Sequence, residues 1–300
     1  MTRYDKEQAR FIVFSAFPKT GSTLLPDLIL RLLKSKVHRF GTAYSKNNFR
    51  YFAKEYQNFF YKTHDVPSVF IKKVLKSPLG YEDFINSDSS KVFSSKASDN
   101  VVLIYNYRNP FNVLLSAIDY SKLLMKKKEV TEKWRKSGKD ILYFTNLLGL
   151  KEVPDPGAFD HFKVKDLSKS HLSDIVWKFV DSRGEIPIFG RTPYFDHVNI
   201  YSNRVDSSSN AALVTYEDMM SCSQESTKRI ARLMGLDWYG FDQALTSMHA
   251  DRTNGDDPHF KKGFYSKTRT TTPSFIRELD CFSGLKDSIF EQSPLLGVLV

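Results

Sequence analysis

The sequence predicts an α/β fold in which helices flank a central, mainly parallel sheet. Three short apolar segments rich in β-branched and aromatic residues have the composition of buried strands, namely residues 11–17, 101–105 and 211–214. A helix-forming pattern follows each of them along the chain. Strands that alternate with helices favour a parallel sheet, and such sheets bind ligands at the carboxyl ends of their strands. We therefore expect the functional residues directly after these segments.

The first predicted strand, residues 11–17 (FIVFSAF), leads through the turn 18–23 (PKTGST) into a helix. Behind the turn, leucine and isoleucine recur at helical spacing, at positions 24, 25, 28, 29, 32 and 33. Pro26 is compatible with this helix because it falls in the first turn. The segment is therefore predicted to be a strand–loop–helix unit.

The other two predicted strands are also followed by signals of a helix start. Asn109 and Pro110 have the residue types preferred at the N-cap and at the first helical position. After the third strand, Ser221 and Gln224 form a capping-box pattern. Gly235 is placed to end the helix that follows.

Length and composition indicate an ordinary globular protein. Of the 300 residues, 41% are hydrophobic and 26% are charged, and we expect one domain over residues 1–300 with possible insertions near 68–98 and 121–170. Two cysteines are too few for a disulfide scaffold, and no apolar run reaches the ~20 residues that span a bilayer. We therefore expect a reduced, cytoplasmic protein with no membrane anchor. The net charge of +10 suits an anionic partner, but charge alone does not distinguish a nucleotide from a nucleic acid, an acidic polymer or a membrane surface.

The turn 18–23 has the composition of a phosphate-binding loop. Gly21 allows a tight turn, and backbone N–H groups at the start of the next helix would face an anion together with the helix dipole. The loop is not a Walker A motif, because GxxxxGK[ST] is absent and Lys19 precedes the glycine.

Three further motifs carry cations or a histidine. In KTHDVP, His64 can act as a general base while Lys62 stabilises negative charge. Arg108 directly follows the second predicted strand, where its guanidinium can bind a phosphate through two nitrogens, and Ser116 lies two turns into the next helix. The segment 261–263 (KKG) offers a phosphate two cations and a flexible glycine. Taken singly, each motif is also compatible with a solvated surface.

Together these motifs resemble those of the cytosolic-type sulfotransferase family. The family's PKSGTTW, KTHLP, RNPxDVxxS, FYEDM and RKG motifs correspond, in the same order, to PKTGSTL, KTHDVP, RNPFNVLLS, TYEDM and KKG between residues 18 and 263. The resemblance implies a single P-loop-like domain with three layers. It also implies transfer of a sulfuryl group from 3′-phosphoadenosine 5′-phosphosulfate (PAPS) to a hydroxyl or amine of a small-molecule acceptor, with adenosine 3′,5′-bisphosphate (PAP) as product.

The resemblance implies a role for each matching residue. His64 would be the general base of an in-line displacement, and Lys19 and Lys62 would stabilise charge on the transferring group. The 5′-phosphosulfate of PAPS would be bound by Lys19, Thr20, Gly21, Ser22 and Thr23. Its 3′-phosphate would be bound by Arg108, Ser116, Lys261, Lys262 and Gly263. Its adenine would lie beside Tyr216. No metal is expected, since the sequence has no CxxC, no HExxH and no carboxylate cluster with ligand spacing.

The chain also departs from the family pattern. Leu24 stands where the family has an aromatic residue that stacks on adenine, and Lys261 replaces an arginine and so loses its two-pronged hydrogen bonding. Ser266 and Thr268 replace the glycine and tryptophan that follow RKG. The segment between the second and third motifs is longer than in the family. The chain is therefore identified as a divergent member.

Two alternatives belong to other functional classes. A Mg²⁺-dependent P-loop kinase of small molecules would need an acidic metal ligand, for which Glu217 and Asp218 are available, but the Walker A lysine is missing. A non-catalytic anion or RNA binder would use the basic surface, but no RNA-binding motif with interleaved aromatic residues is present. We expect neither a nucleic-acid nor a membrane partner. The acceptor, the choice between O- and N-sulfation and the oligomeric state are not readable from the sequence.

Overall fold

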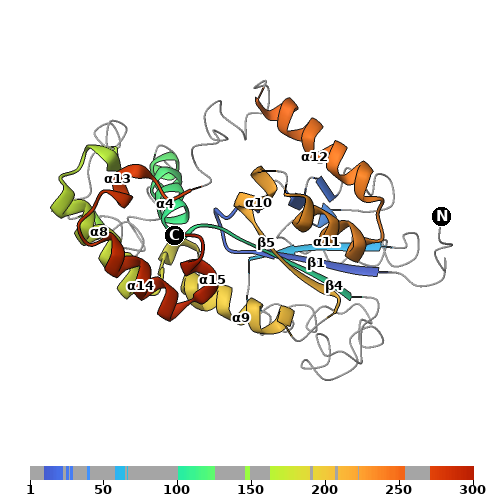
Figure 1. Cartoon of the computed structure of the whole chain (residues 1–300), viewed down its shortest axis with the longest axis horizontal. Helices are drawn as coiled ribbons and strands as arrows, with labels where there is room; N and C mark the ends of the chain where they lie inside the picture. The colour runs from blue at the N-terminus through green and yellow to red at the C-terminus, as the bar shows by residue number, and fades with distance from the viewer. Residues whose placement is uncertain are drawn as a thin grey trace. The chain divides into compact units, whose positions relative to one another are not determined.

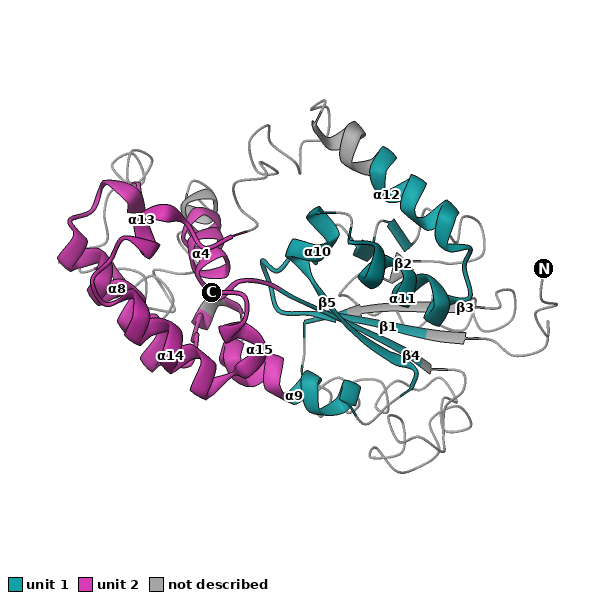
Figure 2. Ribbon diagram, viewed as in Figure 1, with its two compact units in different colours: residues 1–107, 200–266 teal, residues 108–199, 267–300 magenta. Residues whose placement is uncertain are grey.

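The computed structural model describes residues 10–22, 25–26, 28–29, 39–40, 58–64, 66, 101–125, 146–148, 163–189, 192–206, 209–221, 223–253 and 271–300. The chain divides into two compact units (Figure 2). Unit 1 comprises residues 1–107 and 200–266, and unit 2 comprises residues 108–199 and 267–300. The expected single domain over residues 1–300 stays a prediction. Of the two possible insertions, 68–98 lies outside the described residues and 121–170 is described only in part.

In its described part, unit 1 contains a five-stranded sheet with the order β2-β3-β1-β4-β5 (Figure 1). The strands are β1 (Arg10–Ala16), β2 (Arg39–Phe40), β3 (Asn58–Thr63), β4 (Val101–Tyr107) and β5 (Ala211–Thr215). All of the strand pairs in it are parallel. This confirms the predicted α/β class with a parallel sheet, and β1, β4 and β5 are the three strands expected from the sequence.

Both faces of the sheet are covered, which gives unit 1 three layers. Alternate residues of β1, β4 and β5 form one hydrophobic core with α11 (Gln224–Met234) and α12 (Trp238–Thr253). On the opposite face, the ring of Tyr105 stacks on Tyr201 of α9 (Tyr194–Asp206), with the ring centroids 4.3 Å apart. Burial on both faces explains why these strands read as continuous apolar runs rather than alternating ones.

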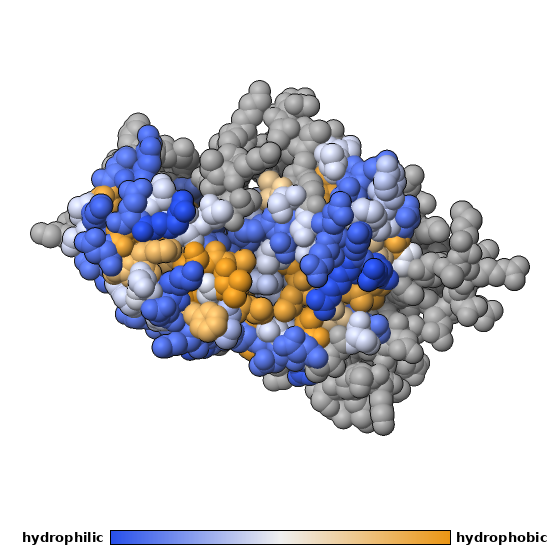
Figure 3. Space-filling view, viewed as in Figure 1, coloured by the Kyte–Doolittle hydropathy of each residue, from blue (hydrophilic) through white to orange (hydrophobic). Residues whose placement is uncertain are grey.

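Helix α11 is amphipathic. Ile230, Ala231 and Met234 are buried, while the hydrophilic side chains over this helix face outward in Figure 3. Gly235 ends the helix in a left-handed conformation with φ 63°, as predicted. The predicted capping box is wrong. Ser221 instead ends α10 (Tyr216–Met220), and the residue before α11 is Ser223, so Gln224 is the first helical residue rather than the third.

Unit 2 is helical in its described part. Its helices are α4 (Pro110–Met125), α8 (Lys169–Asp181), α13 (Ser274–Arg277), α14 (Phe282–Gln292) and α15 (Pro294–Gly297), with 3-10 turns at Val164–Asp166 and Pro187–Phe189 and the first half of α9. The ring of Phe179 in α8 meets that of Phe195 in α9 edge-on, 6.0 Å between centroids. Trp177 packs against Gly284 of α14, where an added Cβ would lie 3.6 Å from the indole. Within the ranges that the structure describes, no helix is long and apolar enough to cross a membrane.

Candidate functional site

The predicted phosphate-binding loop begins at the carboxyl end of β1. The Thr20 hydroxyl stabilises it through hydrogen bonds to backbone carbonyl groups. The Thr20 hydroxyl, which is fully buried, lies 2.7 Å from the carbonyl oxygen of Phe17 and 3.2 Å from that of Asn106. Its single proton is therefore directed at carbonyl groups of the protein, and only lone pairs remain for a ligand. In the structure this hydroxyl stabilises the conformation of the loop. A contact of Thr20 with the 5′-phosphosulfate stays a prediction.

Asn106, near the end of β4, fastens the loop from a neighbouring strand. Its amide Nδ2 donates to the carbonyl oxygen of Thr20 at 2.8 Å, and the side chain is 1% exposed. Asn106 is not among the site residues predicted from the sequence. The sequence does offer a clue to its structural importance, because an asparagine within a buried strand must find hydrogen-bond partners.

Two residues of the loop have left-handed backbone conformations, Lys19 with φ 71° and Gly21 with φ 89°. Backbone turns of this kind form concave surfaces lined by N–H groups that bind anions. An added Cβ at Gly21 would lie 2.3 Å from Cδ2 of Tyr216 and 3.3 Å from Nδ2 of Asn106. The loop therefore requires glycine at this position, both for its conformation and for the approach of the Tyr216 ring. Ser22 is half-buried, and Thr23 lies outside the described residues.

His64 follows β3, and its ring is oriented by β1. The Nδ1 atom lies 2.6 Å from the carbonyl oxygen of Ala16, the last residue of β1. Since a carbonyl oxygen only accepts, Nδ1 carries a proton, and in the neutral ring Nε2 is then the proton-accepting nitrogen. Because β1 and β3 are parallel neighbours with Ser15 opposite Thr63, His64 and the loop share one edge of the sheet. Lys62 lies in β3 opposite Phe14, and its side chain is outside the described part of the structure.

Tyr216 is the first residue of α10, directly after β5, and it is 5% exposed. Thr215 caps this helix, accepting a hydrogen bond at Oγ1 from the Asp218 N–H at 2.9 Å. The ring of Tyr216 packs on Gly21, so the start of α10 lies against the phosphate-binding loop. The expected place of Tyr216 beside the adenine stays a prediction.

Tyr107 ends β4 opposite Thr215 and is buried. The pKa of the Tyr107 phenol is raised to about 12, mainly by burial and to a smaller extent by the negative charges of Asp218 and Glu217. The phenol is therefore protonated at neutral pH and can donate but not abstract a proton. Asp218 also accepts a hydrogen bond at Oδ2 from the Ser226 hydroxyl at 3.0 Å.

The residues expected at the 3′-phosphate belong to unit 2 or are not described. Arg108 is 6% exposed, and Ser116 in α4 is 5% exposed. Asn109 is the predicted N-cap of α4, which is confirmed because its Oδ1 accepts hydrogen bonds from the N–H groups of Phe111 (3.0 Å) and Asn112 (3.3 Å). Lys261, Lys262 and Gly263 lie outside the described residues.

The structure thus brings three elements of the predicted site together within unit 1, namely the loop 19–22, His64 and Tyr216. Asn106, which was not predicted from the sequence, joins them. Among the described residues, no group of three or more His, Cys, Asp or Glu side chains is arranged to hold a metal ion.

Comparison with known proteins assigns the family. A family model described as the sulfotransferase domain matches residues 10–253. A crystal structure of mouse sulfotransferase SULT7A1 complexed with PAP is similar in fold, with a TM-score of 0.53 and 14% sequence identity over 98% of this chain and 90% of that one. No curated protein matches the sequence. The family model spans most of the chain, including the phosphate-binding loop, His64 and Tyr216, and the chain therefore belongs to the sulfotransferase domain family, as its motifs indicated.

Proposed function

We propose that this enzyme transfers the sulfuryl group of PAPS to a hydroxyl or amine of a small-molecule acceptor, with His64 as the general base. The observation that carries the proposal is the hydrogen bond between Nδ1 of His64 and the carbonyl oxygen of Ala16, 2.6 Å long, at the start of the phosphate-binding loop. It directs the basic Nε2 away from the strand that holds the ring, as a proton-abstracting histidine requires.

The loop after β1 fits a phosphate-bearing nucleotide. Position 21 has no side chain, the backbone is left-handed at positions 19 and 21, and the loop is fixed by buried hydrogen bonds before any ligand arrives. Such a rigid concave backbone can bind phosphate oxygens without further ordering. Lys19, Thr20, Gly21, Ser22 and Thr23 would surround the 5′-phosphosulfate, and Tyr216 would contact the adenine. When bound, PAPS would supply the sulfuryl group and depart as PAP.

The chain's own residues would perform three tasks. His64 would accept the acceptor's proton at Nε2 as the acceptor attacks. Lys19 and Lys62 would stabilise negative charge that develops on the transferring group. The place of Lys62 in β3, two residues before His64, supports this assignment.

A second cluster would recognise the 3′-phosphate. Arg108 offers a guanidinium that can bind two phosphate oxygens at once, and Ser116, Lys261, Lys262 and Gly263 would complete the contacts. The mouse structure named above was solved with PAP, which carries both phosphates, and this supports the choice of nucleotide. A cytoplasmic location, small-molecule acceptors and independence from metals are part of the same proposal.

Calorimetric titration tests the proposal most directly. PAP is titrated into the protein without Mg²⁺, with AMP and ATP as controls. We expect PAP to bind much more tightly than AMP, and this preference to weaken in Arg108→Ala. A protein that prefers ATP, or that binds only once Mg²⁺ is added, would contradict the proposal and favour a kinase. Binding that ignores the 3′-phosphate but grows with the length of an RNA would favour a polyanion binder.

A further inference from the structure

The hydroxyl of Tyr194 is hydrogen-bonded to both backbone polar groups of Arg108. It accepts from the Arg108 N–H at 2.8 Å and donates to the Arg108 carbonyl oxygen at 2.5 Å. Both residues belong to unit 2, and Tyr194 is fully buried. A single oxygen atom therefore fixes the peptide groups on either side of the Arg108 side chain.

Tyr194 is itself held in place, because the start of α9 is attached to the turn that follows α8. The N–H of Tyr194 donates to the carbonyl oxygen of Gly184 at 3.1 Å, and the N–H of Phe195 donates to that of Arg183 at 3.0 Å. Gly184 has φ 75°, and an added Cβ there would lie 2.9 Å from Cβ of Tyr194. The turn and the helix start therefore pack too closely for the tyrosine to shift.

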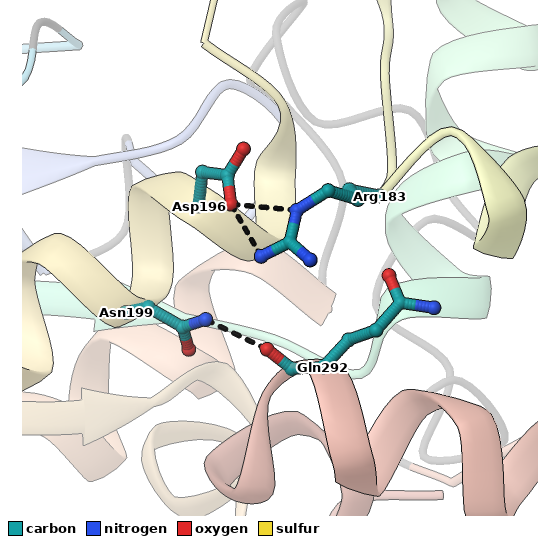
Figure 4. Close-up of polar contacts among 4 residues, drawn as sticks. All are labelled: Arg183, Asp196, Asn199 and Gln292. Carbon is teal, nitrogen blue, oxygen red and sulfur yellow. Dashed lines mark hydrogen bonds and ion pairs between the residues drawn. The ribbon is translucent and has the colours of Figure 1, made fainter.

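An ion pair fastens the same turn to α9 (Figure 4). The Arg183 guanidinium donates to Oδ1 of Asp196 through Nε at 2.8 Å and through Nη2 at 2.5 Å. These side chains are 43% and 35% exposed, so the pair contributes modestly to stability but restricts the direction of the helix start. Three residues at the helix start, 194 to 196, are thus tied to the turn at 183 and 184.

The residue after Arg108 is held as well. The amide of Asn109 donates to the Thr272 hydroxyl at 2.8 Å and to the Leu299 carbonyl oxygen at 2.6 Å, in addition to capping α4. The Arg108 backbone is therefore held by the Tyr194 hydroxyl, and the Asn109 side chain is held by the Thr272 hydroxyl and the Leu299 carbonyl oxygen.

We propose that Tyr194 is a positioning residue that sets the preference for a 3′-phosphorylated nucleotide by fixing the backbone of Arg108. The inference rests on the proposed function, in which the Arg108 guanidinium binds the 3′-phosphate. Two-pronged recognition of phosphate depends on the direction of the guanidinium plane, so freedom in the backbone beneath it lowers affinity. In this inference Tyr194 acts through Arg108 and not through a contact with the nucleotide.

The test is Tyr194→Phe, which removes one oxygen and keeps the buried ring. The dissociation constants of PAP and AMP are measured by calorimetry for the wild type and the variant, and their ratio reports what the 3′-phosphate contributes. We expect the PAP affinity to fall by about tenfold and the AMP affinity to change by less than about twofold. The matched control is Tyr201→Phe, on the same helix and equally buried, which should leave the ratio unchanged.

A double-mutant cycle separates positioning from a general effect on folding. In the Arg108→Ala background, Tyr194→Phe should leave the PAP-to-AMP ratio unaltered, since the group that it positions is gone. Equal losses for PAP and AMP, or an unaltered ratio in the single variant, would overturn the inference. A wild-type protein that does not prefer PAP over AMP would instead overturn the proposed function, and this inference with it.

Discussion

Asn106 and Thr20, which are 86 residues apart in the chain, hold each other through two reciprocal hydrogen bonds. The Asn106 amide donates to the Thr20 carbonyl oxygen at 2.8 Å, and the Thr20 hydroxyl lies 3.2 Å from the Asn106 carbonyl oxygen. The pair joins β4 to the phosphate-binding loop after β1, and both side chains are buried. The conformation of the loop therefore depends on a strand that the loop does not follow in sequence.

Asn106→Leu should weaken binding of the 5′-phosphate more than it weakens the fold. Leucine has a similar shape but leaves the Thr20 carbonyl without this donor, which costs about 1 kcal/mol. The same substitution removes Oδ1 of Asn106, a buried atom with no hydrogen-bond partner in the described part of the chain, and this offsets the loss of stability. We expect the PAP affinity to fall about tenfold by calorimetry, with the affinity for adenosine 3′-monophosphate nearly unchanged.

The control for Asn106→Leu is Thr227→Val in α11, which also removes a buried hydrogen-bonding group of unit 1. The Thr227 hydroxyl bonds to the carbonyl oxygen of Ser223 and receives the indole N–H of Trp238, with no loop residue involved. It should lower the unfolding temperature without altering nucleotide affinity. Equal losses of affinity for both nucleotides in Asn106→Leu would argue against its action on the loop.

Gly21→Ala should destabilise the protein and abolish nucleotide binding. The residue has φ 89°, which costs a residue with a side chain about 1 kcal/mol or more, and the added Cβ would lie 2.3 Å from Tyr216. Either the loop or the tyrosine must move. Gly240→Ala in α12 is the matched control, because its nearest contact would be 3.8 Å and alanine favours a helix by roughly 0.5–1 kcal/mol. Chemical denaturation should therefore give opposite signs for the two variants.

The strands that carry the site could be predicted from the sequence because each is buried on both faces. β1, β4 and β5 then read as continuous apolar runs, and the loop, Arg108 and Tyr216 follow them directly. Local capping was partly predictable. Asn109 is the N-cap of α4 as expected, whereas Ser221, which ends the short helix α10, was mistaken for the start of α11.

The hydrogen bonds that hold the site residues in place could not be predicted, because they join segments that are distant in the sequence. Tyr194 begins a helix whose sequence has no motif, and its hydroxyl meets Arg108 across 86 residues. His64 Nδ1 donates to the backbone carbonyl oxygen of Ala16. Every residue type has such a carbonyl, so the sequence does not indicate this contact. The motifs thus predicted which groups bind the ligand, while the fold determined which other groups hold those residues in place.

His64→Ala should sharply reduce sulfuryl transfer and spare nucleotide binding. A general base contributes typically 10²–10⁴-fold to a rate, so turnover should fall by about that factor. The ring is half-buried with Nδ1 on the Ala16 carbonyl oxygen, and the proposed phosphate contacts come from the loop 19–23, so the PAP affinity should change little. Transfer is followed with radiolabelled PAPS and a panel of small phenols and amines. Undiminished turnover in the variant would exclude His64 as the base, and a parallel loss of PAP affinity would indicate that the ring shapes the loop instead.

Tyr107 should make the stability of the protein fall between about pH 10 and pH 12. Burial, followed by the charges of Asp218 and Glu217, raises the pKa of its phenol from 10.0 to about 12 in the folded state. Above pH 10 the unfolded chain therefore releases this proton while the folded protein retains it, so the unfolded state gains stability as pH rises. Below pH 10 the phenol is protonated in both states, and the full contribution of the group is present. Denaturation of wild type and Tyr107→Phe at pH 9, 10 and 11 isolates the group, and the difference between their unfolding free energies should shift steadily against the wild type. A difference that is constant across this range would mean that the phenol titrates normally in the folded protein.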